Sequence, residues 1–200
     1  GDDPDTPFNE FWDTQGNSWG VEFLLKKSTG RLNGWVGYTY AETKYFTEPS
    51  GWHHPNFDRT HTINIVGNIE LTEELEISTA LTQSSGNPYT KILGRVYDWE
   101  QNLYQDTYWY PLDSYIVGEK NTERYDDYFR IDVGMTRKGG NLFGLQYDTY
   151  WQVMNVTKHL NAFSYAYRTK TGMNGDQLGV ERRVVPQFPL ILTFGVKFDF

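Results

Sequence analysis

The sequence LTFGVKFDF, residues 192–200, places an apolar side chain at every second position and carries an aromatic residue at position 200. An alternation of period 2 predicts a β-strand with one apolar face and one polar face. Chain ends are usually polar and frayed. An aromatic residue in phase with the apolar face therefore predicts that the end of this strand is ordered against apolar surroundings.

The same period runs through most of the chain, and no stretch shows a convincing helical period. Hydrophobic and polar residues alternate over segments that are long for strands of globular proteins, whose commonest length is about 5–6 residues. Strands are therefore expected at residues 18–27, 32–46, 59–71, 75–85, 128–138, 142–156 and 189–200.

The composition favours strands and turns and excludes several classes of site. Aromatic residues make up 17% of the chain, with 15 Tyr, 12 Phe and 7 Trp, and there are 19 Gly. Aromatic residues favour strands, and glycine favours turns. The chain has no cysteine, so disulfides and thiolate metal sites are excluded. A net charge of -8 disfavours nucleic acid as a partner.

The connections between the expected strands alternate in length. Short turns follow the first, third and fifth strands, and long segments follow the second, fourth and sixth. Transmembrane β-barrels sort their connections in this way, with short periplasmic turns and long extracellular loops. The chain contains no run of about 18 apolar residues, so no transmembrane helix is predicted. No signal-peptide pattern is present.

Strand composition also favours a membrane barrel. A tilted strand needs about 9–11 residues to cross a bilayer, and these segments are long enough. Aromatic residues such as Trp19, Phe129 and Trp151 gather near strand ends, as in interfacial girdles. Charged residues such as Arg130 and Asp132 fall mid-strand on the polar face, which suits a wet or plugged lumen. The alternative is a soluble β-protein whose apolar face is its core, since aromatic residues favour strands in general.

Two levels of resemblance follow from these residues. The ending TFGVKFDF resembles the C-terminal assembly signal of outer-membrane barrels, through Thr193, Gly195, Phe198 and Phe200. This resemblance implies recognition by the barrel-assembly machinery. The remaining chain resembles the C-terminal third of a TonB-dependent outer-membrane receptor. The stretches that carry this resemblance are GVEFLLKKSTGRLNGWVGYTYAETKY, FDRTHTINIVGNIELTEELEISTALTQSSGNPYT, YFRIDVGMTRK and LQYDTYWQVMNV.

The resemblance implies an all-β, antiparallel transmembrane barrel segment of about seven strands. Residues 1–17 would be an extracellular loop segment, and residues 18–200 the C-terminal portion of the barrel. Members of the family close a 22-stranded barrel around an N-terminal plug. The chain has no recognisable plug or TonB box, and an odd number of strands fits a fragment that begins in a surface loop.

The function implied by the resemblance is import of a scarce siderophore, glycan or peptide across the bacterial outer membrane. The implied partners are outer-membrane lipid, the rest of the barrel and plug, the TonB complex through the missing plug region, the barrel-assembly machinery and, in some branches of the family, a surface lipoprotein lid. Two alternatives stay open. One is a passive channel or structural barrel assembled from partial barrels, and the other is a soluble carbohydrate-binding β-domain.

Candidate ligand-binding residues lie in the expected long loops. His53 and His54, beside Trp52, are the only histidine pair and could contact a metal or metallophore. We favour two exposed loop histidines instead, because metal sites need convergent ligands. Aromatic residues of the next loop could stack on a ligand or pack the loop itself; they include Trp99, Tyr108, Trp109 and Tyr110. No nucleophile and base pair or phosphate loop is apparent, so neither catalysis nor a cofactor is expected.

Overall fold

The fold of this chain is all-β. The computed structural model describes residues 14–48, 50–97, 113–171, 174 and 177–199. Within these residues there are fourteen strands, and every strand pairing is antiparallel. The predicted all-β class with antiparallel sheets is confirmed. No helix in the described residues is long and apolar enough to cross a membrane.

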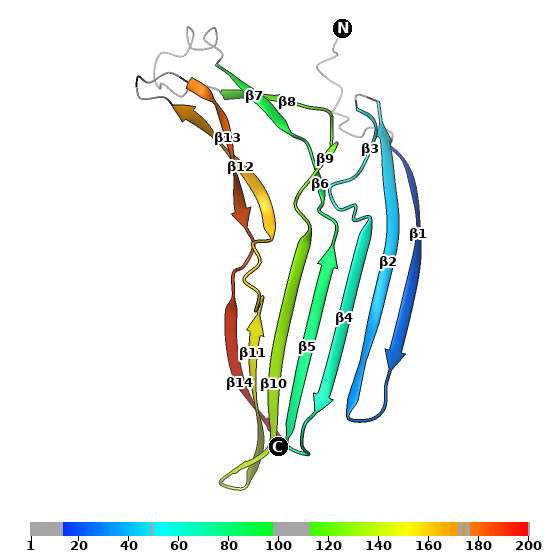
Figure 1. Cartoon of the computed structure of the whole chain (residues 1–200), viewed down its shortest axis with the longest axis vertical. Coiled ribbons are helices and arrows are strands. Elements are labelled where there is room, and N and C mark those ends of the chain that lie inside the picture. The colour runs from blue at the N-terminus through cyan, green and yellow to red at the C-terminus, as the bar shows by residue number, and fades with distance from the viewer. Residues whose placement is uncertain (1–13, 49, 98–112, 172–173, 175–176, 200) are drawn as a thin grey trace, which may run out of the picture.

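One large curved sheet dominates the structure (Figure 1). Its strands lie side by side in sequence order, and β3 (Gly51–His53) adds to the upper part of the second strand. The other strands, in order, are β1 (Gln15–Lys27), β2 (Leu32–Thr47), β4 (His61–Glu70), β5 (Leu75–Ser84), β10 (Tyr128–Leu142), β11 (Leu145–Met154) and β14 (Ile191–Asp199). Within the described residues β1 and β14 are open edges, so this sheet does not close into a barrel.

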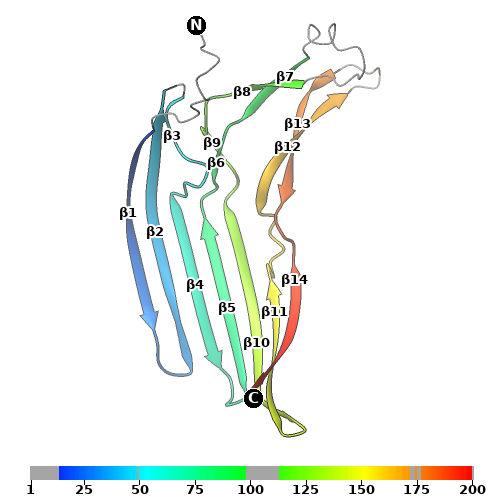
Figure 2. The same cartoon turned by 180° about the vertical axis from the view of Figure 1, so that it is seen from behind.

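Connections are sorted by end, as the sequence predicted. The turns from β1 to β2, from β4 to β5 and from β10 to β11 are short, and they lie at the end where β14 finishes. The three long connections lie together at the opposite end, here called the loop end (Figure 2). β1 begins at Gln15, so residues 15–17 belong to a strand and not to the expected loop segment 1–17.

The long connections contain strands that sequence periodicity did not predict. They form three two-stranded sheets, so the expected count of about seven strands does not describe the whole fold. Each of these pairs lies within a single long connection, and several of its strands are too short to show a period of their own. The strands are β6 (Pro88–Tyr89) with β9 (Glu123–Arg124), β7 (Ile92–Tyr97) with β8 (Asp113–Val117), and β12 (Ala162–Thr171) with β13 (Gln177–Pro186).

The hairpin between β10 and β11 turns later than expected. Residues 138–141 were expected to form the turn, but β10 continues to Leu142 and the turn falls at Phe143 and Gly144, both with positive φ. The glycine pair marks an irregularity in the register instead. A Cβ at Gly140 would lie 2.3 Å from the Tyr147 ring, so glycine there makes room for the aromatic side chain of the partner strand.

The register separates two chemically different faces. Leu32, Ile69, Ile77, Met135, Trp151 and Phe194 are partners across six successive strands. One residue further along, Asn33, Asn68, Ser78, Gly134, Gln152 and Thr193 are partners across the same strands. Because neighbouring residues of a strand point to opposite faces, the first row lies on what we call the apolar face and the second on the polar face.

Neither face of the large sheet holds a hydrophobic core. In the strands of this sheet from β1 to β14, leaving β3 aside, Ser84 is the only buried residue among those whose burial is described. Side chains of the apolar face are open; Phe194, for example, is 77% exposed. The other buried residues that the structure describes lie at the loop end, and half of them are polar. The sheet therefore needs apolar surroundings beyond the described residues, since water would oppose so much exposed apolar surface.

Candidate ligand site at the loop end

A buried carboxylate joins the first two long connections. The Asp58 side chain is 1% exposed and pairs with Arg124 of β9. Its Oδ1 accepts a hydrogen bond from the Thr43 backbone N–H at 2.7 Å. Arg124 also donates to the carbonyl oxygens of Asp58 and Gly86, both at 3.0 Å. A buried charge is tolerated when it is paired and hydrogen-bonded, so this cluster holds the loop after β2 against β9.

Asn121 makes a second link between the same connections. Its backbone has a φ of 54°, in the left-handed region that asparagine tolerates. Its Nδ2 donates to the His54 carbonyl at 2.7 Å and to Asn56 Oδ1 at 2.6 Å. Its Oδ1 accepts from Thr90 Oγ1 at 3.2 Å. Loops from distant parts of the chain are thus fixed relative to one another.

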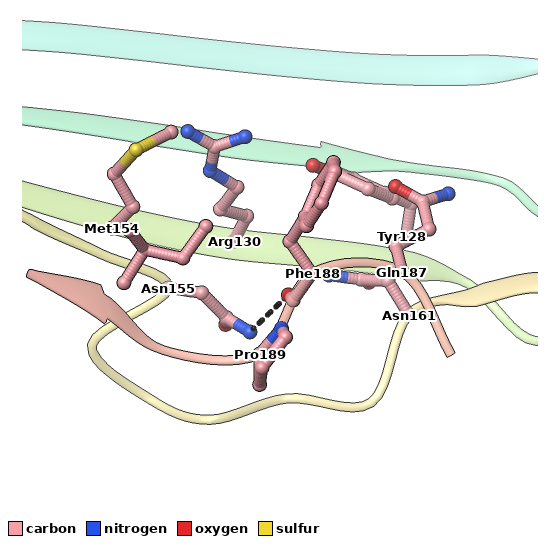
Figure 3. Close-up of a pocket in the computed structure, with 9 residues that line it drawn as sticks. Tyr128, Arg130, Met154, Asn155, Asn161, Gln187, Phe188 and Pro189 are labelled. Carbon is pink, nitrogen blue, oxygen red and sulfur yellow. Dashed lines mark hydrogen bonds between the residues drawn. The ribbon is translucent and has the colours of Figure 1, made fainter.

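The third long connection is tied to β10 near a small pocket of about 40 Å³ (Figure 3). Asn155 N–H donates to Asp132 Oδ1 at 2.9 Å, and its Nδ2 donates to the Phe188 carbonyl at 3.5 Å. Arg130 Nε donates to Asp132 Oδ1 at 2.7 Å. Arg130 and Asp132 therefore pair with each other along one strand on the polar face. This pocket has room for only a few water molecules.

A larger cavity of about 560 Å³ opens at the loop end, and we call it the tyrosine pocket. Its volume lies within the range of about 300–1,000 Å³ typical of ligand pockets. Its walls come from the connection after β2, from the segments around β6 and β9, and from β12. The aromatic residues of the wall are Tyr89, Tyr125, Phe163, Tyr165 and Tyr167.

Three tyrosines form the packed side of this pocket. The ring centroids of Tyr89 and Tyr125 lie 4.7 Å apart, as do those of Tyr125 and Tyr165. Tyr89 meets Tyr165 edge-on at 5.1 Å. The Arg182 guanidinium lies 4.1 Å from the Tyr165 ring centroid and donates to Tyr89 Oη at 3.0 Å. Such aromatic and cation–π contacts stabilise the cluster and fix its ring orientations.

Burial shifts the pKa of two tyrosines of the cluster. Burial raises the pKa of Tyr125 above its usual value of 10.0, and burial likewise raises the pKa of Tyr165. The hydrogen bond to Tyr89 raises the pKa of Arg182, which stays charged. Tyr165 Oη donates to Asp126 Oδ2 at 3.4 Å. At neutral pH Tyr125 and Tyr165 therefore present phenol hydroxyls, and not phenolates, to a ligand.

The residues around the histidine pair have structural contacts in this fold. The expectation of two exposed loop histidines is wrong for His53, because this residue ends β3 and is buried. Its Nδ1 lies 3.0 Å from the Gly51 carbonyl oxygen. His54 Nδ1 lies 2.9 Å from the Thr43 carbonyl oxygen. Trp52 is exposed and packs against Phe46, with ring centroids 5.6 Å apart. These three residues do not line the tyrosine pocket. Their binding role stays a prediction, and the described residues hold no cluster of His, Cys, Asp or Glu suited to a metal ion.

The structure describes only some of the predicted loop aromatics and assembly-signal residues. Trp99, Tyr108, Trp109 and Tyr110 lie outside the described residues, as does Phe200. Thr193, Gly195 and Phe198 lie on β14. A Cβ at Gly195 would lie 2.2 Å from the Tyr150 ring, so glycine at this position has a packing reason independent of any assembly signal.

Sequence reasoning did not identify the tyrosine pocket. Tyr89, Tyr125 and Tyr165 lie in the long segments between the expected strands, for which the sequence predicted no regular structure. The alternation of Phe163, Tyr165 and Tyr167 was the available signal, because residues two apart on a strand share a face. This alternation does not indicate which other segment the shared face packs against, and only the three-dimensional arrangement shows that.

No family model, curated protein or solved structure matches this chain. What the chain can do follows instead from two features of its own structure. One is the sheet with an uncovered apolar face, and the other is the tyrosine pocket among the loops at one end.

Proposed function

We propose that this chain is the C-terminal barrel segment of a TonB-dependent receptor in the bacterial outer membrane, with a transport and not a catalytic role. The receptor imports a scarce ligand, of the siderophore, glycan or peptide class. The observation that carries the proposal is the apolar face, which continues across seven registered strands and is covered by no second layer of the described residues. In a bilayer, lipid covers such a face.

The height of the apolar face supports a membrane span. On β2 the apolar face runs from Leu32 to the position of Glu42, ten residues further along. Ten steps of about 3.3 Å give roughly 33 Å along the strand. A strand tilt of about 40° reduces this to roughly 25 Å, which is the height of the apolar band of outer-membrane barrels.

Both margins of the apolar face carry amphipathic aromatic residues. At the loop end Trp19 packs on Tyr40, with ring centroids 5.2 Å apart, and donates through Nε1 to Glu42. At the other end Tyr147 packs near Phe198, with centroids 6.0 Å apart. Aromatic rings with polar tips favour the two bilayer interfaces. The short turns would then lie in the periplasm and the long connections outside the cell.

The open edges support a larger assembly. Unpaired backbone groups at β1 and β14 would be costly in hydrocarbon, where no water can bind them. A single-chain receptor pairs them with its remaining strands and fills the lumen with its plug. The polar face suits that lumen, since it carries a row of neutral amides and hydroxyls and a Lys138–Glu76 ion pair at 2.9 Å.

The test is the behaviour and mass of the native polypeptide that carries this sequence. The expected result is an outer-membrane protein that needs detergent for extraction and has an intact mass several times 23.4 kDa. A detergent-free soluble protein would overturn the membrane assignment and favour the soluble β-domain. A membrane protein of 23.4 kDa would have no room for a plug, so it would replace active import with a passive or structural barrel built from partial barrels.

A further inference from the structure

We propose that the tyrosine pocket binds a neutral oligosaccharide. This inference rests on the proposed function, because it takes the loop end as the outer mouth of an importer and names the class of ligand. A pyranose ring packs its C–H face on an aromatic ring while its hydroxyls hydrogen-bond to nearby amides. The pocket combines both kinds of group within a volume suited to a short saccharide chain.

Two asparagine side chains supply oriented donors. Asn56 Oδ1 accepts from Asn121, and Asn87 Oδ1 accepts from Arg59 Nε at 2.9 Å. Each accepted bond fixes the orientation of the amide. Within the described residues, Nδ2 of Asn56 and of Asn87 has no acceptor. Each amide group has two N–H donors, so the pocket has oriented donors for the hydroxyl oxygens of a sugar.

A third polar group lacks a partner at the same place. Among the described residues, Tyr167 Oη is buried and makes no hydrogen bond. A buried hydroxyl without a partner costs roughly 1–3 kcal/mol. Because this hydroxyl is buried, a ligand with donors and acceptors, such as a sugar, can satisfy it only when the Tyr167 side chain turns toward the pocket. This observation is independent of the asparagines, because Tyr167 comes from β12 and not from the connections that carry Asn56 and Asn87.

The charges of the wall favour a neutral ligand over an ionic one. Lys120 is the only charged residue among the described residues of the wall, and it is exposed. Arg182 already contacts Tyr89 and Tyr165, and Asp126 accepts from Tyr165. An anionic ligand would need several cationic side chains that are not already paired. A peptide with charged termini would need both a positive and a negative side chain in the wall. Tyrosine rings and amides meet neither need.

The rings exposed to the pocket provide the stacking surface. Phe163 lies on β12, lines the pocket and is 71% exposed, so its ring is available and its removal should leave the fold intact. Phe143 is a matched control. It is 99% exposed and lies in the short turn between β10 and β11, at the opposite end of the sheet.

The experiment is calorimetric titration of the complete detergent-purified polypeptide with maltotriose, cellotriose, xylotriose and chitotriose. We expect at least one trisaccharide to bind. Phe163→Ala should weaken that binding about tenfold or more, and Phe143→Ala should leave it unchanged. Tyr167→Phe removes only the buried hydroxyl and should weaken binding several-fold while leaving the assembled barrel intact.

The possible results separate the two proposals. If no trisaccharide binds to correctly assembled protein, or if both phenylalanine variants bind equally well, the saccharide site is refuted. Binding of the ferric hydroxamate ferrioxamine B that is lost in Phe163→Ala, without saccharide binding, would also refute it and assign the pocket to another class of ligand. Membrane insertion is scored separately, by heat-dependent gel mobility. Failure of insertion therefore counts against the barrel proposal, whatever the titrations show.

Discussion

Arginine substitutions at matched positions of β5 would test which face of the sheet contacts lipid. Leu81 lies on the apolar face, between its register partners Ile65 and Ile131. Ser78 lies on the same strand but on the polar face, beside Asn68 and Gly134. The proposed barrel therefore predicts that Leu81→Arg destabilises the protein in a bilayer and that Ser78→Arg does not.

The expected size of the effect depends on depth. An arginine on the lipid face costs about 2–4 kcal/mol at the midplane and about 0–1 kcal/mol near the interfaces. Since 1.36 kcal/mol is a factor of ten, Leu81→Arg should shift the folding equilibrium roughly 30- to 900-fold. Trp19→Arg, at the expected interface, should shift it by roughly fivefold or less. Ser78→Arg would place its charge in a wet lumen beside neutral neighbours.

The assay is denaturant unfolding of the complete polypeptide from lipid vesicles, followed by gel mobility and tryptophan fluorescence. The reasoning predicts the order Leu81→Arg, then Trp19→Arg, then Ser78→Arg, from most to least destabilised. Equal losses at Leu81 and Ser78 would indicate a sheet packed on both faces, as in a soluble protein. A larger loss at Ser78 than at Leu81 would show that the assigned facing is inverted. Gly134 is a poorer probe than Ser78, because a Cβ there would lie 2.5 Å from Ser78 Oγ.

Two further predictions concern the loop end. Arg124→Met leaves the Asp58 carboxylate buried and without its main partner, which costs about 3–5 kcal/mol; limited proteolysis should then cut the connections after β2 and β5 much faster, and unchanged cleavage would contradict the role of this pair. The pKa of Tyr165 is raised by burial, so the folded state holds this proton more tightly than the unfolded state. The corresponding stability is complete below pH 10.0 and is lost as the pH rises through the folded pKa. The measurement is the phenolate absorbance of the unchanged protein minus that of Tyr165→Phe, followed as the pH rises. The midpoint of this difference should therefore lie above pH 10.0, and a midpoint at or below that pH would contradict the assignment.

The strands of the large sheet were predictable because their signal is local. In the second strand, for example, Val36, Tyr38 and Tyr40 alternate with Gly37 and Thr39. This pattern predicts a strand with two different faces even when its neighbouring strands are unknown. The same logic failed where short strands pair within a long connection at the loop end. β6 and β9 each have two residues and carry no period of their own.

The β10–β11 hairpin shows a second limit of local reasoning. A Gly–Gly pair is a strong turn signal, but Gly139 and Gly140 lie within the extended β10 instead. The reason is a side chain on the other strand, because Tyr147 occupies the space beside Gly140. A glycine that makes room for an aromatic ring and a glycine that makes a turn look alike until the partner strand is placed.

By itself, the sequence determined the all-β class, the two faces of each long strand and the sorting of short and long connections, since each depends on spacing along one segment. Only the tertiary structure decided which loop residues meet. Tyr89, Tyr125 and Tyr165 are distant in the chain, yet their rings lie within about 5 Å of one another. The physical reason is that strand pairing sets the positions of the loops, while a long polar loop carries no periodic signal of the partner against which it packs.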